Sequence, residues 1–186
     1  ALVPDAKLIA LVRNPVDRAF SHYQHEVALG REPLSFENAL EAEDERLRGE
    51  EERMRADPAY FSRAWWDYTY RARGRYAEQI ERWLALFPRE RLLILPSEDM
   101  LAEPEQTYAG VLDFLGAPPH RLDSYPRVFE RQYEPMRPET RERLVAELQV
   151  GHAAAVALHV ARGEQHGEQV APVASLAAAL GDHAVD

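Results

Sequence analysis

A short apolar segment that leads directly into a capped helix constrains the fold of this chain more than any other feature. Residues 7–12 read KLIALV, which is too short and too uniformly apolar for an exposed helix. Such a run is typical of a strand covered on both faces, as in a parallel sheet. Asn14 then provides an N-cap, and Pro15 occupies the first helical position, where its missing N–H is not needed. We therefore expect a buried strand and then a helix from Pro15 to Leu29, which ends at Gly30.

The rest of the sequence repeats this alternation of strand and helix. A second short apolar run, RLLILP at residues 91–96, predicts a second parallel strand. Further helices are expected from Ser35 through Arg55, within residues 59–87 with a break or kink at Gly74, from Glu103 to Leu115, and from Arg137 to Gln149. This order of strand, helices, strand and helix indicates an α/β domain.

Two of these helical segments differ in their expected burial. The segment that starts at Ser35 carries a thin apolar stripe among many charges, which predicts a solvated flank. Beyond Gly74, apolar residues recur at helical spacing, which predicts a face packed in the core. These core candidates are Tyr76, Ile80, Trp83, Leu84 and Phe87.

Composition narrows the classes of function. The 186 residues are enough for one ordinary domain, and the net charge of −10 argues against a general nucleic-acid binder. The sequence has no cysteine, which excludes disulfides and thiolate metal sites and fits a cytoplasmic location. No apolar run approaches the roughly 18 residues of a membrane span. Lys7 is the only lysine, so this sequence holds no Gly-rich phosphate loop of the kind that needs one.

The strand-to-helix junction also suggests a site for an anion. In an open α/β sheet, ligands lie beyond the carboxyl ends of the strands, where a helix N-terminus presents backbone N–H groups. Arg13 stands at that edge, and Ser21 follows two helical turns later. An arginine fork with one hydroxyl suits a terminal phosphate monoester. On these residues alone, the favoured interpretation is structural, with Arg13 paired with a carboxylate and Ser21 packed against another helix.

Longer segments of the sequence resemble a known family. Residues 4–23, PDAKLIALVRNPVDRAFSHY, closely resemble the 3′-phosphate-binding segment of sulfotransferases that use 3′-phosphoadenosine 5′-phosphosulfate (PAPS), in particular the bacterial branch related to heparan sulfate sulfotransferases. Residues 74–118 and 133–144 are similar to the second and third blocks of that family, in the same order. The resemblance implies an α/β fold of P-loop-NTPase-like type, in which a parallel sheet is flanked by helices.

The resemblance also implies an activity and a donor site. Members move a sulfuryl group from PAPS to an acceptor hydroxyl or amine, here on a carbohydrate-like or small-metabolite acceptor, and no metal is required. Arg13 and Ser21 would bind the 3′-phosphate of the nucleotide, whereas Asp17 and Arg18 match the family pattern with a structural role.

Two elements of the family pattern are not found in this sequence. They are the loop of Lys, Gly and hydroxyl residues that holds the 5′-phosphosulfate, and the glutamate that serves as catalytic base in heparan-type members. We therefore expect residues 1–148 to be the carboxyl-terminal part of a sulfotransferase domain, incomplete at its N-terminus and with little activity alone. The catalytic base would lie upstream of residue 1, and residues 149–186, rich in Ala and His, would form a divergent, weakly structured tail.

Two other functions fit the same strand-to-helix junction. One is a nucleotide kinase-like P-loop enzyme, which needs a GxxxxGK[ST] loop and Mg²⁺. The other is a non-catalytic remnant or interaction module. The acceptor and the oligomeric state are left open by the sequence.

Several polar residues have both a chemical and a structural interpretation. His22 is next to Ser21 and is a candidate proton acceptor, but a helical neighbour points about 100° away. Glu98 and Asp99 follow the second strand. One interpretation makes them a catalytic carboxylate pair; the better-supported interpretation is that they cap a turn or a helix.

The aromatic cluster and the histidines near the end of the chain also have both a functional and a structural interpretation. Trp65, Trp66, Tyr68 and Tyr70 line an acceptor cleft in one interpretation and a packed core or lid in the other. Histidines recur every seven residues at 152, 159 and 166, but no carboxylate or thiolate is arranged to complete a metal shell, so we expect no metal.

Overall fold

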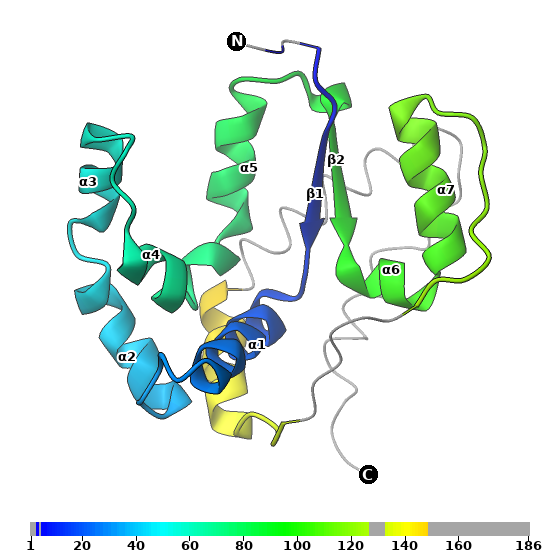
Figure 1. The fold of residues 1–186 in the computed structure, drawn as a ribbon. Coiled ribbons are helices and arrows are strands. Elements are labelled where there is room, and N and C mark those ends of the chain that lie inside the picture. Colours follow the sequence, from blue (N-terminus) through cyan, green and yellow to red (C-terminus); the bar gives the residue numbers. More distant parts are fainter. Residues whose placement is uncertain (1–2, 4, 127–132, 149–186) are drawn as a thin grey trace.

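Both expected strands are present and lie parallel. The computed structural model describes residues 3, 5–126 and 133–148 of the chain. Within it, β1 (Leu8–Val12) pairs with β2 (Leu92–Pro96) over their whole length (Figure 1). The pairing places Val12 opposite Pro96, so the carboxyl ends of both strands meet at one edge.

Helices make up most of the remaining described chain. Between the strands lie α1 (Pro15–Ala28), α2 (Phe36–Arg46), α3 (Glu50–Ala56), α4 (Arg63–Tyr68), η1 (Ala72–Gly74), α5 (Tyr76–Leu84) and η2 (Arg89–Arg91). After β2 come α6 (Ser97–Ala102) and α7 (Pro104–Leu115), and residues 138–148 form a further helix.

Different helices cover the two faces of β2. One face of β1 is open, with Ile9 43% and Leu11 57% exposed, so the expectation that the first strand is covered on both faces was wrong. Alternate residues of a strand point to opposite faces, and Leu92 and Ile94 accordingly pack with Tyr76 and Ile80 of α5. On the other face, Leu93 and Leu95 pack with Phe114 of α7. In Figure 1, α5 and α7 accordingly lie on opposite sides of the strand pair. The predicted α/β fold, a parallel sheet flanked by helices, is confirmed.

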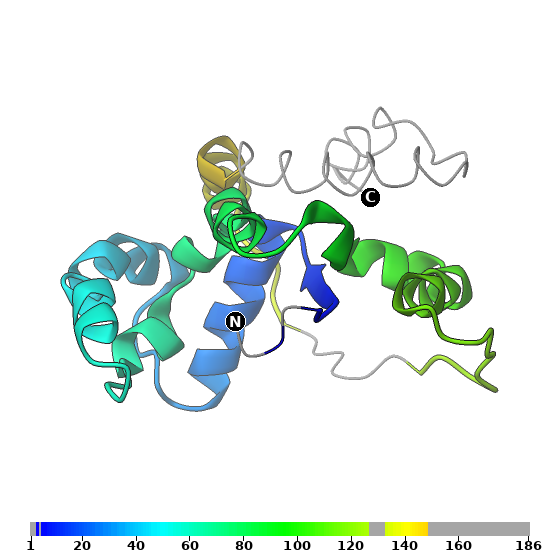
Figure 2. The same cartoon turned by 90° about the horizontal axis from the view of Figure 1, so that it is seen from above.

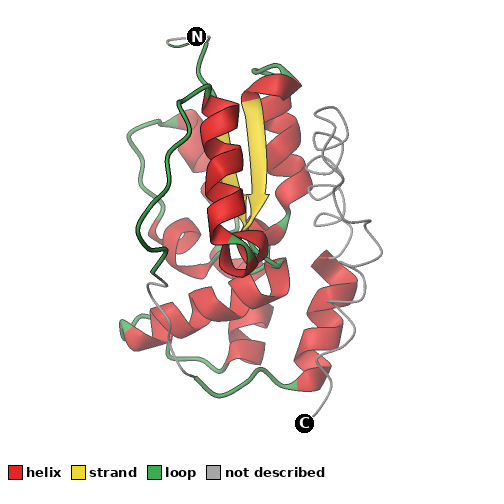
Figure 3. Ribbon diagram, turned by 90° about the vertical axis from the view of Figure 1, so that its right-hand side faces the viewer, coloured by secondary structure: helices red, strands yellow, loops and turns green. Residues whose placement is uncertain are grey.

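A second core lies beyond the carboxyl ends of the strands and is made of helices. Figure 3 shows this helical part at one end of the strands, and Figure 2 shows α2, α3 and α4 gathered on one side of them. Phe20 of α1 meets Phe36 of α2 edge to face, with ring centroids 5.0 Å apart. Other members of this core are Val16, Ala19, Ala39, Leu40, Tyr70, Leu144 and Leu148. Because residues of α1 belong to this core, α1 fixes the helical part to the sheet edge where Arg13 stands.

The charged segment after Ser35 differs from the prediction. It forms two helices, because Gly49 adopts a left-handed conformation (φ +74°) between α2 and α3. The prediction of a solvated flank was wrong for α2, since Phe36 and Leu40 are buried in the helical core. One apolar stripe is enough to anchor a helix when the facing helices supply the rest of the core.

The predicted core face of α5 is narrower than its sequence indicates. Tyr76, Ile80 and Leu84, which are four residues apart, face the sheet. Trp83 is 49% exposed and packs beside Phe87 instead, with ring centroids 6.0 Å apart. Two strands present too little surface to cover all five apolar side chains.

Helix termini follow the predicted signals. Asn14 caps α1, and Gly116 ends α7 in a left-handed conformation (φ +72°). The predicted tail at 149–186 lies outside the described residues. None of the helices in the described ranges combines the length and apolar character needed to cross a membrane.

Candidate functional site

Arg13 directly follows β1, at the edge where the carboxyl ends of the strands meet. Arg13 is exposed, and within the described part of the chain its guanidinium has no carboxylate partner. The alternative of a paired Arg13 therefore finds no support there. An unpaired guanidinium at this edge is available to an anionic ligand.

The N-terminus of α1 contributes less to anion binding than we expected. The Asn14 side chain accepts hydrogen bonds from the backbone N–H groups of Val16 (3.0 Å) and Asp17 (3.4 Å), and the Asn14 carbonyl accepts one from Arg18. Pro15 has no N–H, so the first-turn donors are already satisfied. The expectation of free backbone donors at this terminus was wrong, because the cap that starts the helix also uses them. Binding of an anion at this edge therefore depends on side chains.

Ser21 lies on α1, about 9 Å along the helix axis from Pro15. It is partly buried, and its hydroxyl has no hydrogen-bond partner among the described residues. The hydroxyl is thus free to donate to a ligand oxygen.

Asp17 and Arg18 make the structural contacts that their predicted role requires. Asp17 forms an ion pair with Arg141 of the helix at 138–148. Arg18 donates to the carbonyl oxygens of Thr69 (3.1 Å) and Tyr70, which joins α1 to the segment after α4. Burial lowers the pKa of Arg18, and its Nε has no partner in the described structure.

His22 faces the helical core. Its ring meets Tyr70 edge to face at 5.2 Å, and its Nε2 lies 3.6 Å from a Glu26 carboxylate oxygen. Burial, with the nearby charges of Arg18 and Arg73, lowers the pKa of His22 to about 4. The ring is therefore uncharged at neutral pH and packs against Tyr70 of the helical core, which does not favour a proton-transfer role.

Glu98 connects the end of β2 to the residue after Arg13. Its Oε1 accepts a hydrogen bond from the backbone N–H of Asn14 at 2.8 Å. The Ser97 hydroxyl lies 3.3 Å from the other carboxylate oxygen of Glu98. The structural interpretation of Glu98 is thus supported, although its partner is the distant β1–α1 junction rather than its own helix.

Tyr76 has a polar role that its sequence pattern did not predict. Its hydroxyl forms a hydrogen bond with the backbone of Arg13, and burial raises its pKa. A position in an apolar stripe predicts only core packing, and that packing is present. The contact joins residues far apart in the chain, so no local pattern signals it.

The aromatic cluster divides between core and surface. Tyr70 is fully buried, and Tyr68 packs against the helical core with Arg46 over its ring at 4.1 Å. Trp66 is 55% exposed and lies near Arg73, whose guanidinium is 5.3 Å from its ring centre. Of the four aromatic residues, only Trp65 and Trp66 therefore still fit the acceptor-cleft interpretation.

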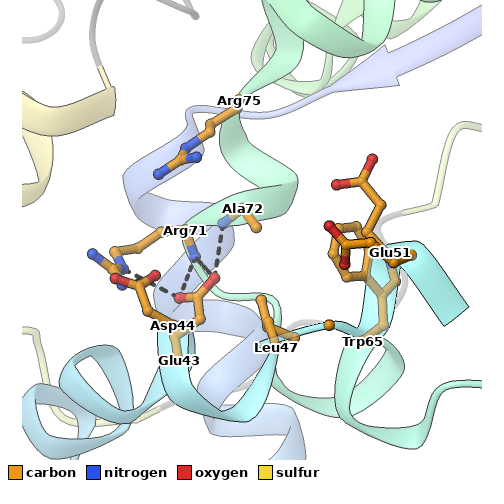
Figure 4. A pocket seen from close by; sticks show the side chains of 10 residues that line it. Glu43, Asp44, Leu47, Glu51, Trp65, Arg71, Ala72 and Arg75 are labelled. Carbon is orange, nitrogen blue, oxygen red and sulfur yellow. Dashed lines mark hydrogen bonds and ion pairs between the residues drawn. The ribbon is translucent and has the colours of Figure 1, made fainter.

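Trp65 lines an open pocket of about 270 Å³ between α2, α3, α4 and η1 (Figure 4). The buried carboxylate of Glu43 closes one side, where it accepts hydrogen bonds from the backbone N–H groups of Arg71 and Ala72. Arg75 lies on another side of the pocket and directly precedes Tyr76. A flat indole beside charged groups is a suitable surface for a polar, ring-shaped molecule.

In the part of the chain that the structure describes, no group of three or more His, Asp or Glu side chains is placed to hold a metal ion. The histidines at 152, 159 and 166 lie outside it.

Comparison with known proteins agrees with this geometry. The family model described as "Sulfotransferase domain" matches residues 1–145. Bifunctional heparan sulfate N-deacetylase/N-sulfotransferase 3 of Mus musculus is 33% identical over 124 residues, which are 64% of this chain and 13% of that protein. Bifunctional heparan sulfate N-deacetylase/N-sulfotransferase 2 of Homo sapiens is 30% identical over 126 residues, which are 64% of this chain and 12% of that protein.

A solved structure is similar over more of the chain. The crystal structure of a sulfotransferase from Alicyclobacillus acidocaldarius superposes with a TM-score of 0.60 at 36% identity. The match covers 84% of this chain and 55% of that one, whereas this chain spans only about an eighth of the length of the curated relatives. Since the family model covers most of the chain, the chain belongs to the PAPS-dependent sulfotransferase family.

Proposed function

We propose that the chain binds the 3′-phosphate of PAPS through Arg13 and Ser21, and that it serves sulfuryl transfer to an acceptor hydroxyl or amine. The observation that carries this proposal is the exposed Arg13 guanidinium, which has no carboxylate partner among the described residues and stands at the carboxyl end of a parallel strand. The Ser21 hydroxyl, also without a partner there, supports it.

The two side chains divide the binding of a phosphate between them. A guanidinium donates two parallel hydrogen bonds to phosphate oxygens and neutralises charge, and a hydroxyl donates one further bond. When bound, PAPS supplies the sulfuryl group, which passes from the 5′-phosphate oxygen to the acceptor oxygen or nitrogen. Holding the 3′-phosphate fixes the nucleotide, and positioning of this kind is a main source of rate in group transfer.

The acceptor proposed first is a carbohydrate amine. The names of the curated relatives specify N-sulfotransferase action on heparan sulfate. The indole of Trp65 at the pocket offers a flat surface on which a sugar ring can stack. A hydroxyl of a small metabolite is the alternative acceptor. The division at residue 148 and the cytoplasmic location remain predictions.

Calorimetric titration with 3′-phosphoadenosine 5′-phosphate tests the donor site. Charge-assisted hydrogen bonds contribute about 1.5–3 kcal/mol, so Arg13→Ala should weaken binding roughly ten- to a hundredfold. Ser21→Ala should weaken it roughly tenfold, because one hydrogen bond from an uncharged donor to the phosphate is lost while the charge of Arg13 stays. Arg48→Ala, which removes an exposed arginine that pairs with Glu45, is the matched control. Equal affinity of the wild type and Arg13→Ala would refute the proposal.

A further inference from the structure

Two side chains from other elements hold the backbone at the site. The Tyr76 hydroxyl forms a hydrogen bond with the backbone of Arg13, and Glu98 accepts the N–H of Asn14 at 2.8 Å. Tyr76 is the first residue of α5, and Glu98 lies in the first turn of α6. The junction between β1 and α1 is thus held from both neighbouring helices.

These contacts act where regular structure gives the backbone no partner. The strand pairing ends at Val12, and the intrahelical hydrogen bonds of α1 begin with the carbonyl of Asn14. The Asn14 N–H therefore depends on Glu98 for its hydrogen bond. Because Arg13 immediately precedes Asn14, the direction in which its side chain leaves the backbone depends on this contact.

The charge of Glu98 makes its position informative. An exposed carboxylate close to an anion site repels the anionic ligand. Electrostatics alone therefore does not explain a carboxylate at this position. A hydrogen-bond acceptor, in contrast, is required to fix Asn14. Glutamine would keep an acceptor oxygen and remove the charge.

We propose that Glu98, together with Tyr76, is a positioning residue that fixes the Arg13–Asn14 backbone so that the Arg13 guanidinium is held ready for a phosphate group. This inference rests on the proposed function, because it assigns Glu98 to the site that Arg13 forms. Glu98 itself does not touch the ligand.

The experiment uses two readouts on the full chain. Amide hydrogen exchange reports on the contact without a ligand: in Glu98→Ala, the Asn14 amide should exchange about tenfold faster or more. Titration with 3′-phosphoadenosine 5′-phosphate and with adenosine 5′-monophosphate, which lacks the 3′-phosphate, reports on the site. Glu98→Ala should weaken the first ligand about tenfold and leave the second unchanged.

Conservative and control variants separate positioning from general damage. Glu98→Gln should bind 3′-phosphoadenosine 5′-phosphate as tightly as the wild type or more tightly, because the acceptor oxygen stays and the repulsion is gone. Glu78→Ala, at an exposed position of α5 with no hydrogen bond or ion pair in the described structure, should match the wild type in both readouts.

Each contrary outcome has a distinct meaning. If Arg13→Ala loses affinity and Glu98→Ala does not, the inference is overturned and the proposed function stands. If Arg13→Ala binds like the wild type, or if the wild type shows no binding, the proposed function fails and the assignment of Glu98 to it fails as well. An unchanged Asn14 exchange rate in Glu98→Ala overturns the positioning contact whatever the titrations show.

Discussion

Replacing His22 with glutamine tests the helical part of the molecule, because it removes a largely buried group that resists protonation. His22 packs against Tyr70, with the positive charges of Arg18 and Arg73 nearby and a Glu26 carboxylate oxygen 3.6 Å from its Nε2. Burial and these charges lower its pKa from 6.5 to about 4. In the unfolded chain the imidazole regains its ordinary pKa.

The sign and size of the effect follow from this difference. Between pH 6.5 and pH 4 the unfolded chain binds more protons at His22 than the folded protein, so stability falls as the pH falls. The difference in pKa corresponds to a contribution of about 3 kcal/mol to the free energy of unfolding. About 2 kcal/mol of this contribution is lost between pH 7 and pH 5. In His22→Gln this loss should disappear, whatever the variant's stability at pH 7.

The assay is urea unfolding of both proteins at pH 7 and pH 5, followed by circular dichroism. The quantity compared is the change in the free energy of unfolding between the two pH values. Because every other titrating group is shared, the difference between wild type and variant isolates His22. His25→Gln, an exposed position on the same helix, is the control. The same pH dependence in the wild type and His22→Gln would show that His22 is not held uncharged by its surroundings.

Two substitutions probe how η1 is held in place. A methyl group at Gly74 would approach Cβ of Pro15 to 3.0 Å, so Gly74→Ala should lower the free energy of unfolding by about 1–3 kcal/mol, whereas Gly110→Ala, in open space on α7, should raise it by about 0.5–1 kcal/mol; equal effects in urea unfolding would argue against the close approach. Glu43→Ala leaves two backbone N–H groups at the start of η1 without an acceptor and should cost about 3 kcal/mol, against less than about 1 kcal/mol for the exposed Asp44→Ala. A Glu43 variant as stable as the Asp44 variant in the same assay would contradict the role given to this carboxylate.

The two strands and the start of α1 could be predicted because their signals are local. The two short apolar runs became the parallel strands, and the Asn14–Pro15 cap starts α1 as expected. A cap depends on residues within one turn, so sequence alone displays it. The position of Arg13 directly after a strand is also a local signal, but its assignment to the 3′-phosphate comes from the family resemblance.

The contacts that hold the candidate site could not be predicted, because they join distant segments. Asn14 and Glu98 are 84 residues apart, and the two backbone groups that Glu43 accepts are 28 and 29 residues away. Mixed charge in α2 is typical of a solvated helix, and nothing local distinguishes the buried Glu43 from its exposed neighbour Asp44. Only the arrangement of helices in three dimensions decides which carboxylate finds partners.

A crystal structure of the chain soaked with 3′-phosphoadenosine 5′-phosphate tests the central claim most directly. Our account predicts that the 3′-phosphate lies at the carboxyl end of β1, with phosphate oxygens about 2.7–3.0 Å from the Arg13 guanidinium and from the Ser21 hydroxyl. A nucleotide bound with its 3′-phosphate away from both side chains would contradict it.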